Sequence, residues 1–250
     1  MNTASKLSEI LNIEIGDKIA VVGCNGKTSV IEILAFENIN KKVLISPTTK
    51  IFFMAQKDII VCTTEESCRM HYPVKGVQCF GILQKAVEVG ASQKLSALPL
   101  TLLESLAKSY DIVLMEADGS GGLPFKGYKD YEPVIPSFSS RSIAVINLQA
   151  LYQPATKLCV HNLPEFLLQT GLQENDIIDE YAIVAMVCGK SSMLKSEFLR
   201  NKHSTLLMNG AVDEQHFSAA KQIANIIRMQ YLAIDTFVVG CTRNRTWRKI

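Results

Sequence analysis

The sequence predicts an α/β fold with a doubly wound, mostly parallel β-sheet. Two observations support this: several short runs are apolar throughout, as strands buried on both faces are, and segments with helical spacing alternate with them. The expected strands are Lys18–Val22, Lys42–Ser46, Asp58–Cys62, Gly76–Leu83, Asp111–Glu116, Ser142–Asn147, Ala182–Val187 and Ile234–Gly240. The expected helices are a short one that contains Leu7 and Leu11, then Lys27–Asn38, Pro99–Ser109 and Asp213–Met229.

Length and composition narrow the class of protein. A chain of 250 residues can bury a large core, and we expect a single domain over residues 1–250 with an irregular insertion near residues 148–181. The net charge of +2 argues against nucleic acid or a membrane surface as a partner. We expect a cytoplasmic protein, because no apolar segment is long enough to cross a bilayer and the seven cysteines contain no C-x-x-C pair. The basic tail Arg243–Lys249 should be frayed and solvated, and the alternative is that it docks an acidic partner.

The most informative segment follows the first expected strand and reads Gly23-Cys24-Asn25-Gly26-Lys27-Thr28-Ser29. A glycine turn that leads into a helix start offers unpaired amides and a positive dipole end to a phosphate. We expect an exposed Lys27 to reach the β- and γ-phosphates, and the Thr28 hydroxyl to bind Mg²⁺. The expected phosphate ligands are Gly23, Asn25, Gly26, Lys27, Thr28 and Ser29. The sequence therefore predicts a P-loop NTPase-like fold.

The loop departs from the standard P-loop motif at one position. Val21 stands where G-x-x-x-x-G-K-[ST] requires glycine, which leaves the shorter form that is similar to the nucleotide loop of Mur-type peptide ligases. The alternative interpretation is an ordinary strand, turn and helix with a solvated lysine. Within the loop, Cys24 lies where amides would stabilise a thiolate. We favour the simpler interpretation that a small side chain fits the tight turn.

A second group of candidate residues comes at the end of the strand Asp111–Glu116. Carboxylates that follow a buried parallel strand and lie beside a phosphate loop can hold Mg²⁺ directly or through water. We expect Thr28, Glu116 and Asp118 to be the metal ligands, and Lys27, Glu116 and Asp118 to carry any catalysis. Gly119 would place an amide near the γ-phosphate. The alternative is a strand-ending turn, which Asp-Gly favours.

Two further segments are weaker candidates. Thr48, Thr49 and Lys50 follow the second expected strand and could contact phosphate or Mg²⁺. Lys126 could supply a second positive charge to an anionic ligand. Both segments fit equally well with ordinary loops whose side chains are solvated.

Taken together, four short motifs in this order resemble the YqeC family. They are Gly23–Ser29, Thr48–Ile51, Glu116–Ser120 with Leu123–Lys126, and Glu132–Pro136. The resemblance covers about Ile10 to Ile227. Members of this family are described as accessory proteins of selenium-dependent molybdenum hydroxylases and as selenium cofactor biosynthesis proteins. They usually carry an arginine after the acidic motif, where this chain has Gly121 and Gly122.

The resemblance implies a function that the residues alone do not give. It implies a protein that binds Mg²⁺ with ATP or GTP and assists maturation of a molybdenum hydroxylase, by slow nucleotide hydrolysis or phosphoryl transfer. Its expected partners are the nucleotide and a molybdenum hydroxylase or that enzyme's cofactor-maturation proteins. The alternative is a non-catalytic, nucleotide-responsive scaffold that carries a molybdenum cofactor or a client enzyme. The sequence leaves open which base is bound and whether the protein is an enzyme.

Overall fold

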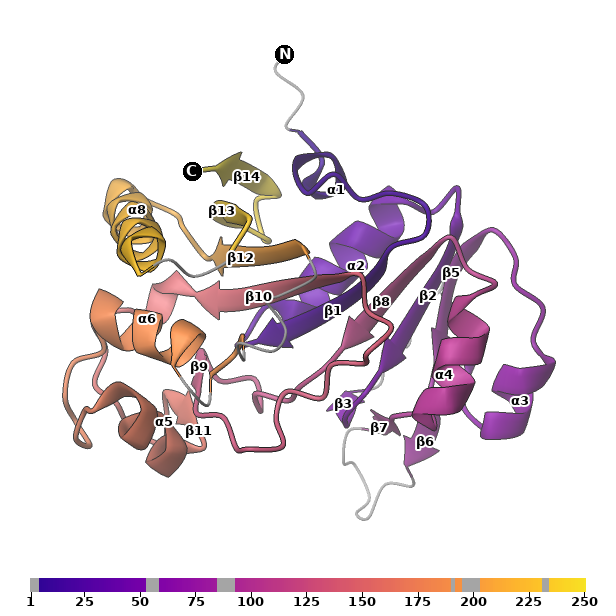
Figure 1. Ribbon diagram of the computed structural model, residues 1–250, viewed down its shortest axis with the longest axis horizontal. Coiled ribbons are helices and arrows are strands. Elements are labelled where there is room, and N and C mark those ends of the chain that lie inside the picture. The colour runs from indigo at the N-terminus through magenta and orange to yellow at the C-terminus, as the bar shows by residue number, and fades with distance from the viewer. Residues whose placement is uncertain (1–4, 53–58, 85–92, 190–191, 195–202, 231–233) are drawn as a thin grey trace.

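The computed structural model describes residues 5–52, 59–84, 93–189, 192–194, 203–230 and 234–250. A sheet of nine strands runs through the molecule in the order β14-β13-β12-β10-β1-β8-β2-β5-β4 (Figure 1). Neighbouring strands are parallel except for β13 and β14, which are antiparallel. The strands are β1 Lys18–Gly23, β2 Lys42–Pro47, β4 Ile59–Cys62, β5 Gly76–Phe80, β8 Ile112–Glu116, β10 Arg141–Asn147, β12 His203–Asn209, β13 Thr236–Cys241 and β14 Thr246–Lys249. The predicted fold class is confirmed.

Smaller elements surround this sheet. The strands β3 Ile51–Phe52, β7 Lys94–Ser96 and β6 Ile82–Gln84 form a separate three-stranded sheet, and β9 Phe125–Lys126 pairs with β11 Val160–His161. The helices are α1 Leu7–Ile10, α2 Lys27–Glu37, α3 Glu65–Met70, α4 Leu100–Ala107, α5 Leu163–Thr170, α6 Glu180–Cys188 and α8 Glu214–Met229. The segment 148–181, expected to be irregular, contains the short 3₁₀ helix Leu148–Ala150, β11 and α5.

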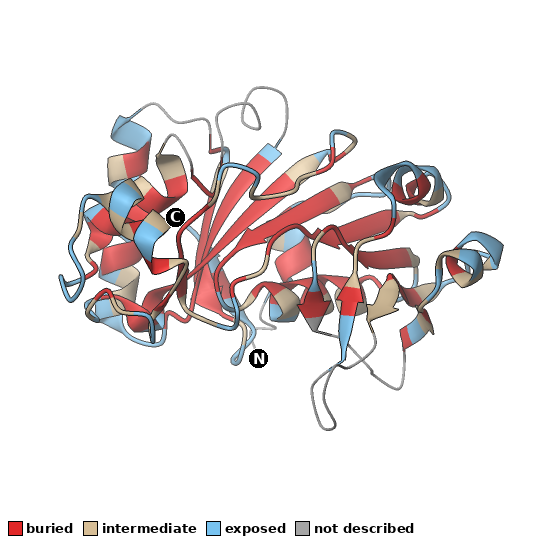
Figure 2. Cartoon of the chain, turned by 90° about the horizontal axis from the view of Figure 1, so that it is seen from below, coloured by how far each residue is buried: buried red, intermediate tan, exposed pale blue. Residues whose placement is uncertain are grey.

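Helices cover both faces of the sheet because the strands alternate their apolar side chains between these two faces. Ile19 and Val21 of β1 point toward α1 and α2, whereas Ala20 and Val22 point toward α5, α6 and α8. Val113 of β8 shares the second face and packs with α3 and α4. Figure 2 shows the resulting continuous buried strands between partly exposed helices. Such two-sided burial explains the uniformly apolar strands of the sequence.

The expected strand Ala182–Val187 is wrong, because these residues lie in α6. An apolar run without clear periodicity fits a buried helix as well as a buried strand. The carboxylate of Asp179 accepts a hydrogen bond from the Ala182 amide at 2.9 Å and starts the helix. The strand that lies between β10 and β13 is instead β12. Its first half is polar, and Ser204 is buried beside Ser142 at 3.3 Å between the two hydroxyls, so the pattern did not indicate a buried strand.

The expected frayed tail is also wrong. Residues Thr246–Lys249 form β14, in which Trp247 pairs with Gly240 of β13. The indole is 9% exposed and joins the apolar cluster that contains α1 and α2. Arg248 lies over the Phe217 ring of α8, at 5.2 Å from its centroid. Tertiary packing therefore orders a segment whose composition alone is typical of a solvated terminus.

None of the described helices is both long enough and apolar enough to cross a membrane.

Replacing Trp247 tests the docking of β14. Trp247→Ala should lower the free energy of unfolding by about 3 kcal/mol, because it removes a large buried side chain and leaves a cavity. The measurement is urea unfolding, with Lys249→Ala, which alters an exposed residue of the same strand, as the control. Equal stability of the two variants would show that the tail is frayed.

Candidate functional site

The candidate site lies at the edge of the sheet where the parallel strands β1, β8 and β2 end. The register brings Glu116 opposite Val21 of β1 and opposite Pro47 of β2. A cavity of about 280 Å³ lies at this edge. It is lined by Cys24, Asn25, Gly26, Lys27, Thr28, Lys50, Ile51, Lys94, Glu116, Gly119, Ser120, Gly121 and Gly122. Ligands of doubly wound folds bind at this edge.

Two glycines give the loop its tight curl. Gly23 and Gly26 have φ values of 117° and 113°, which residues with a side chain rarely adopt. A Cβ atom at Gly23 would lie 2.2 Å from the Val145 carbonyl oxygen, and one at Gly26 would lie 2.6 Å from the Asn209 amide nitrogen. The loop can therefore pack against β10 and β12 only with glycine at both positions.

The start of α2 is available to an anion. Helix α2 begins directly after Gly26 without a side-chain cap, so the amides of Lys27, Thr28 and Ser29 have no partner within the helix. Lys27 and Thr28 also line the cavity. Unpaired amides and the positive end of the helix dipole together favour a phosphate or carboxylate here.

Lys27 is buried, contrary to the expectation that it is exposed. It is 2% exposed, and its ammonium donates to the Gly23 carbonyl at 2.7 Å and pairs with Asp118 at 3.2 Å. Burial opposes the charged form, but the carboxylates of Asp118 and Glu116 outweigh this effect and hold the pKa of Lys27 above its ordinary value. Lys27 is thus a charged residue at the wall of the cavity, which argues against the solvated lysine of an ordinary turn.

Thr28 and Glu116 form the second pair in the cavity. The Thr28 hydroxyl donates to Glu116 Oε2 at 3.0 Å. Burial raises the pKa of Glu116, and the neighbouring Lys27 and this hydrogen bond oppose that shift. Hydroxyl and carboxylate oxygens are the hard donors that Mg²⁺ prefers. Glu116 is the one acidic residue among the described lining residues, which also include three lysines, Lys27, Lys50 and Lys94.

Asp118 lies behind the phosphate loop. Its side chain is fully buried, and its two carboxylate oxygens accept hydrogen bonds from the Gly23 amide, at 3.0 and 2.9 Å. The same carboxylate pairs with Lys27 and lies 3.8 Å from the ammonium of Lys126. These partners make Asp118 a counter-ion that fixes the loop from inside. Its predicted role as a metal ligand stays a prediction.

Lys126 also lies behind the loop, and it is not among the residues that line the cavity. Its fully buried side chain donates to the Gly119 carbonyl at 2.7 Å and to Glu132 Oε1 at 2.9 Å. Direct contact with an anion, as the sequence suggested, would require Lys126 to leave these partners. Its contact with Gly119 instead fixes one wall of the cavity.

Of the segment Thr48–Lys50, only Lys50 is among the described residues that line the cavity. Thr48 is buried, and its hydroxyl donates to the Val134 carbonyl at 2.6 Å while its amide donates to the Glu116 carbonyl at 3.0 Å. Thr49 and Thr48 are absent from the described lining, whereas the exposed Lys50 is part of it. Lys94 reaches the same cavity from β7, and no local sequence motif marks it.

Cys24 is fully buried in the apolar cluster that includes Val22 and Phe125. Burial raises the pKa of the Cys24 thiol to about 12. A thiol with this pKa is protonated at neutral pH and is a weak nucleophile. The structure therefore favours the interpretation that Cys24 fills space in a tight loop.

The described residues contain no group of three or more His, Cys, Asp or Glu side chains that could hold a metal ion. Proteins commonly bind Mg²⁺ with one or two carboxylates, while phosphates of the ligand and water complete the shell. Thr28 and Glu116 fit that pattern.

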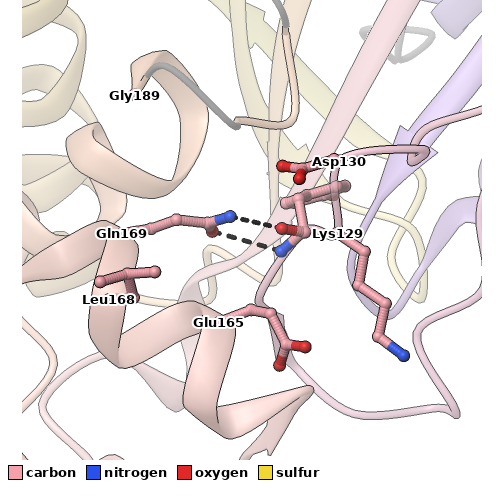
Figure 3. A pocket seen from close by; sticks show the side chains of 7 residues that line it. Lys129, Asp130, Glu165, Leu168, Gln169 and Gly189 are labelled. Atoms are coloured by element: carbon pink, nitrogen blue, oxygen red, sulfur yellow. Dashed lines mark hydrogen bonds between the residues drawn. The ribbon is translucent and has the colours of Figure 1, made fainter.

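A second cavity, of about 440 Å³, lies between α5 and the segment 128–130. Figure 3 shows the Gln169 side chain hydrogen-bonded to the backbone of Tyr128, which donates through its amide at 3.2 Å and accepts through its carbonyl at 2.7 Å. The described residues that line this second cavity include Lys129 but also Asp130 and Glu165. Acidic groups make this cavity less suited to an anion than the first.

The fold and the site define a class: a parallel α/β protein with a P-loop-like glycine loop and an uncapped helix start at the carboxyl edge of its sheet. A family model described as YqeC protein matches residues 19–164. Since this is more than half of the chain, the protein belongs to the YqeC family.

One curated relative extends this comparison. The chain is 29% identical over 171 residues to the "Uncharacterized protein YqeC" of Escherichia coli (strain K12). The matched stretch covers 68% of this chain and 66% of the relative, just under two thirds of its length. No solved structure matches the chain. The family match includes the loop, Glu116, Asp118 and Lys126.

Without nucleotide, Lys27→Ala should lower the free energy of unfolding by about 2–4 kcal/mol, because it leaves the buried Asp118 without its nearest cation. Urea unfolding measures this. The control is Lys50→Ala, an exposed lysine of the same cavity, which should stay within about 0.5 kcal/mol of the parent. If both variants were equally stable, Lys27 would be solvated.

Thiol labelling tests the buried state of Cys24. In the native protein at pH 8, iodoacetamide should leave Cys24 unmodified, because the thiol is inaccessible and its pKa is about 12. In urea the same thiol should react. Mass spectrometry of peptides gives the extent of labelling, with the partly exposed Cys159 as an internal comparison. Rapid native labelling of Cys24 would indicate a reactive loop thiol.

Proposed function

We propose that this YqeC-family protein binds Mg²⁺ together with ATP or GTP in the cavity at the start of α2. The observation that carries the proposal is a coincidence of features in one cavity: an uncapped helix start, three lysines and a hydroxyl–carboxylate pair. Each is common alone. Together they supply amide donors, positive charge and hard oxygen ligands, which a Mg-triphosphate requires.

In this proposal the phosphates take the free amides of Lys27, Thr28 and Ser29. Lys27 leaves the Gly23 carbonyl and turns toward the β- and γ-phosphates. Lys50 and Lys94 contribute further positive charge from the cavity wall. Gly119 lines the same cavity, and a Cβ atom there would make only ordinary van der Waals contact with the Lys50 carbonyl oxygen, at 3.8 Å.

Thr28 and Glu116 would hold the metal ion, and the bound ion would neutralise charge on the phosphates. Asp118 contributes indirectly, since it fixes the Gly23 amide and the position of Lys27. Phosphoryl transfer depends mainly on such positioning and charge stabilisation. No new covalent chemistry is required of these side chains.

Slow hydrolysis or phosphoryl transfer is the reaction that fits this site. Among the described lining residues there is no arginine or histidine, and the one carboxylate already accepts a hydrogen bond from Thr28. The lack of an arginine or histidine among these described lining residues also favours a second candidate, a nucleotide-responsive scaffold that does not hydrolyse its ligand. For either candidate, the family resemblance supports a cytoplasmic role in maturation of selenium-dependent molybdenum hydroxylases, with the hydroxylase or its cofactor-maturation proteins as partner.

Calorimetry with ATP, GTP and CTP, each with and without Mg²⁺, tests the proposal. The parent should bind at least one Mg-nucleotide, and Lys27→Ala should weaken binding at least about tenfold, because it removes the lysine that contacts the phosphates. Glu116→Gln should weaken binding chiefly when Mg²⁺ is present. Circular dichroism checks that each variant is folded.

Failure of the parent to bind any of these nucleotides would refute the proposal, as would unchanged binding by folded Lys27→Ala. Phosphate release during incubation separates the two candidates. Hydroxylase activity in cells that lack the protein, complemented with parent or Lys27→Ala, tests the maturation role. Nucleotide binding without hydrolysis, together with restored hydroxylase activity, would favour the scaffold.

A further inference from the structure

A chain of four charged side chains runs from the cavity into the protein. Lys27 of the phosphate loop pairs with Asp118 at 3.2 Å, and Asp118 lies 3.8 Å from Lys126. Lys126 pairs in turn with Glu132 at 2.9 Å. The first three side chains are buried, and Glu132 is 15% exposed. Charges so far from water interact strongly, because little solvent screens them.

Asp118 is shared between two cations. Lys27 is the nearer one, and it also donates to the carbonyls of Gly23 and Cys24, so these contacts hold it in the loop. Under the proposed function Lys27 must leave Asp118 to contact phosphate. Asp118 would then depend on the Gly23 amide and on Lys126 for stabilisation of its buried charge. The ease of this exchange therefore depends on Lys126.

Lys126 makes two further contacts that suit a cation. Its ammonium lies 5.0 Å from the centroid of the Tyr128 ring, and it donates to the Gly119 carbonyl. Both contacts stabilise a buried cation. Glu132 competes with Asp118 for the same ammonium, and its shorter distance makes it the stronger partner in the nucleotide-free protein.

We propose that Lys126 is a positioning residue that controls the release of Lys27 from Asp118, and that Glu132 limits this action. When Lys27 turns to the phosphates, Lys126 remains as the cation that stabilises Asp118. The inference rests on the proposed nucleotide binding and adds to it a residue that does not touch the ligand. It assigns Lys126 and Glu132 opposite effects on nucleotide affinity.

The test measures the affinity for ATP and GTP by calorimetry at saturating Mg²⁺, the condition under which the proposed function expects binding. Lys126→Met should weaken binding about tenfold, because Asp118 then keeps Lys27 as its only cation. Glu132→Gln should strengthen binding about threefold, because Lys126 becomes fully available to Asp118. Urea unfolding of each variant records any loss of stability.

The Asp118→Asn background separates this mechanism from two others. Asparagine can still accept the Gly23 amide but no longer holds Lys27 by charge. In this background the effects of Lys126→Met and Glu132→Gln should both fall to within about twofold, since additivity fails only for coupled residues. A direct effect of either charge on the phosphates would persist in the double variants. A merely structural role would weaken binding in both single variants.

The outcomes distinguish the proposals. A parent that binds no nucleotide would overturn the proposed function and this inference together. A parent that binds normally, with unchanged affinity in Lys126→Met or with effects that persist beside Asp118→Asn, would overturn this inference alone. If Lys126→Met does not fold, Glu132→Gln decides the matter, because it alters a partly exposed carboxylate; weaker or unchanged binding by this variant would refute the inference.

Discussion

The candidate site depends on the carboxylate of Asp118. It accepts the amide of Gly23, where the loop leaves β1, and it neutralises Lys27, where α2 begins. Both ends of the loop are therefore fixed by one buried acidic group, which follows the neighbouring strand β8. Desolvation makes such a charge costly, and only its cationic and amide partners offset that cost.

This arrangement gives Lys27 two possible environments. In the nucleotide-free protein its charge is satisfied inside the loop, so the cavity is not left with an unpaired buried cation. A phosphate would offer an alternative partner on the cavity side. A loop of this kind can be stable when empty and still suited to an anion, provided that a second cation remains beside Asp118. Lys126 occupies that position.

The site is assembled from segments that are distant in sequence. The glycine loop follows β1, Glu116 ends β8, Lys50 follows β2, and Lys94 comes from the small sheet. Parallel pairing brings the ends of β1, β8 and β2 to a common edge, which is why one cavity can combine them. The stretch that the YqeC family model matches, residues 19–164, includes the loop and both acidic residues.

The sequence by itself determined the fold class, the family and the local identity of the loop. Uniformly apolar strands indicated a sheet covered on both faces, and two glycines before Lys27-Thr28 indicated a curled backbone at a helix start. These are local properties, since backbone freedom and hydrophobic period depend on neighbouring residues. The apolar run Ala182–Val187 had no clear period, and the structure places it in a helix that packs against α5 and α8.

The tertiary structure decided which charged residues face the cavity. Lys27, Asp118 and Lys126 were all candidates for direct contact with the ligand in the sequence, yet the fold buries all three and leaves Asp118 and Lys126 behind the loop. It also brought Lys94 to the wall and ordered Trp247 in β14. The physical reason is that burial and charge pairing depend on contacts between segments far apart in the chain, which no local pattern contains.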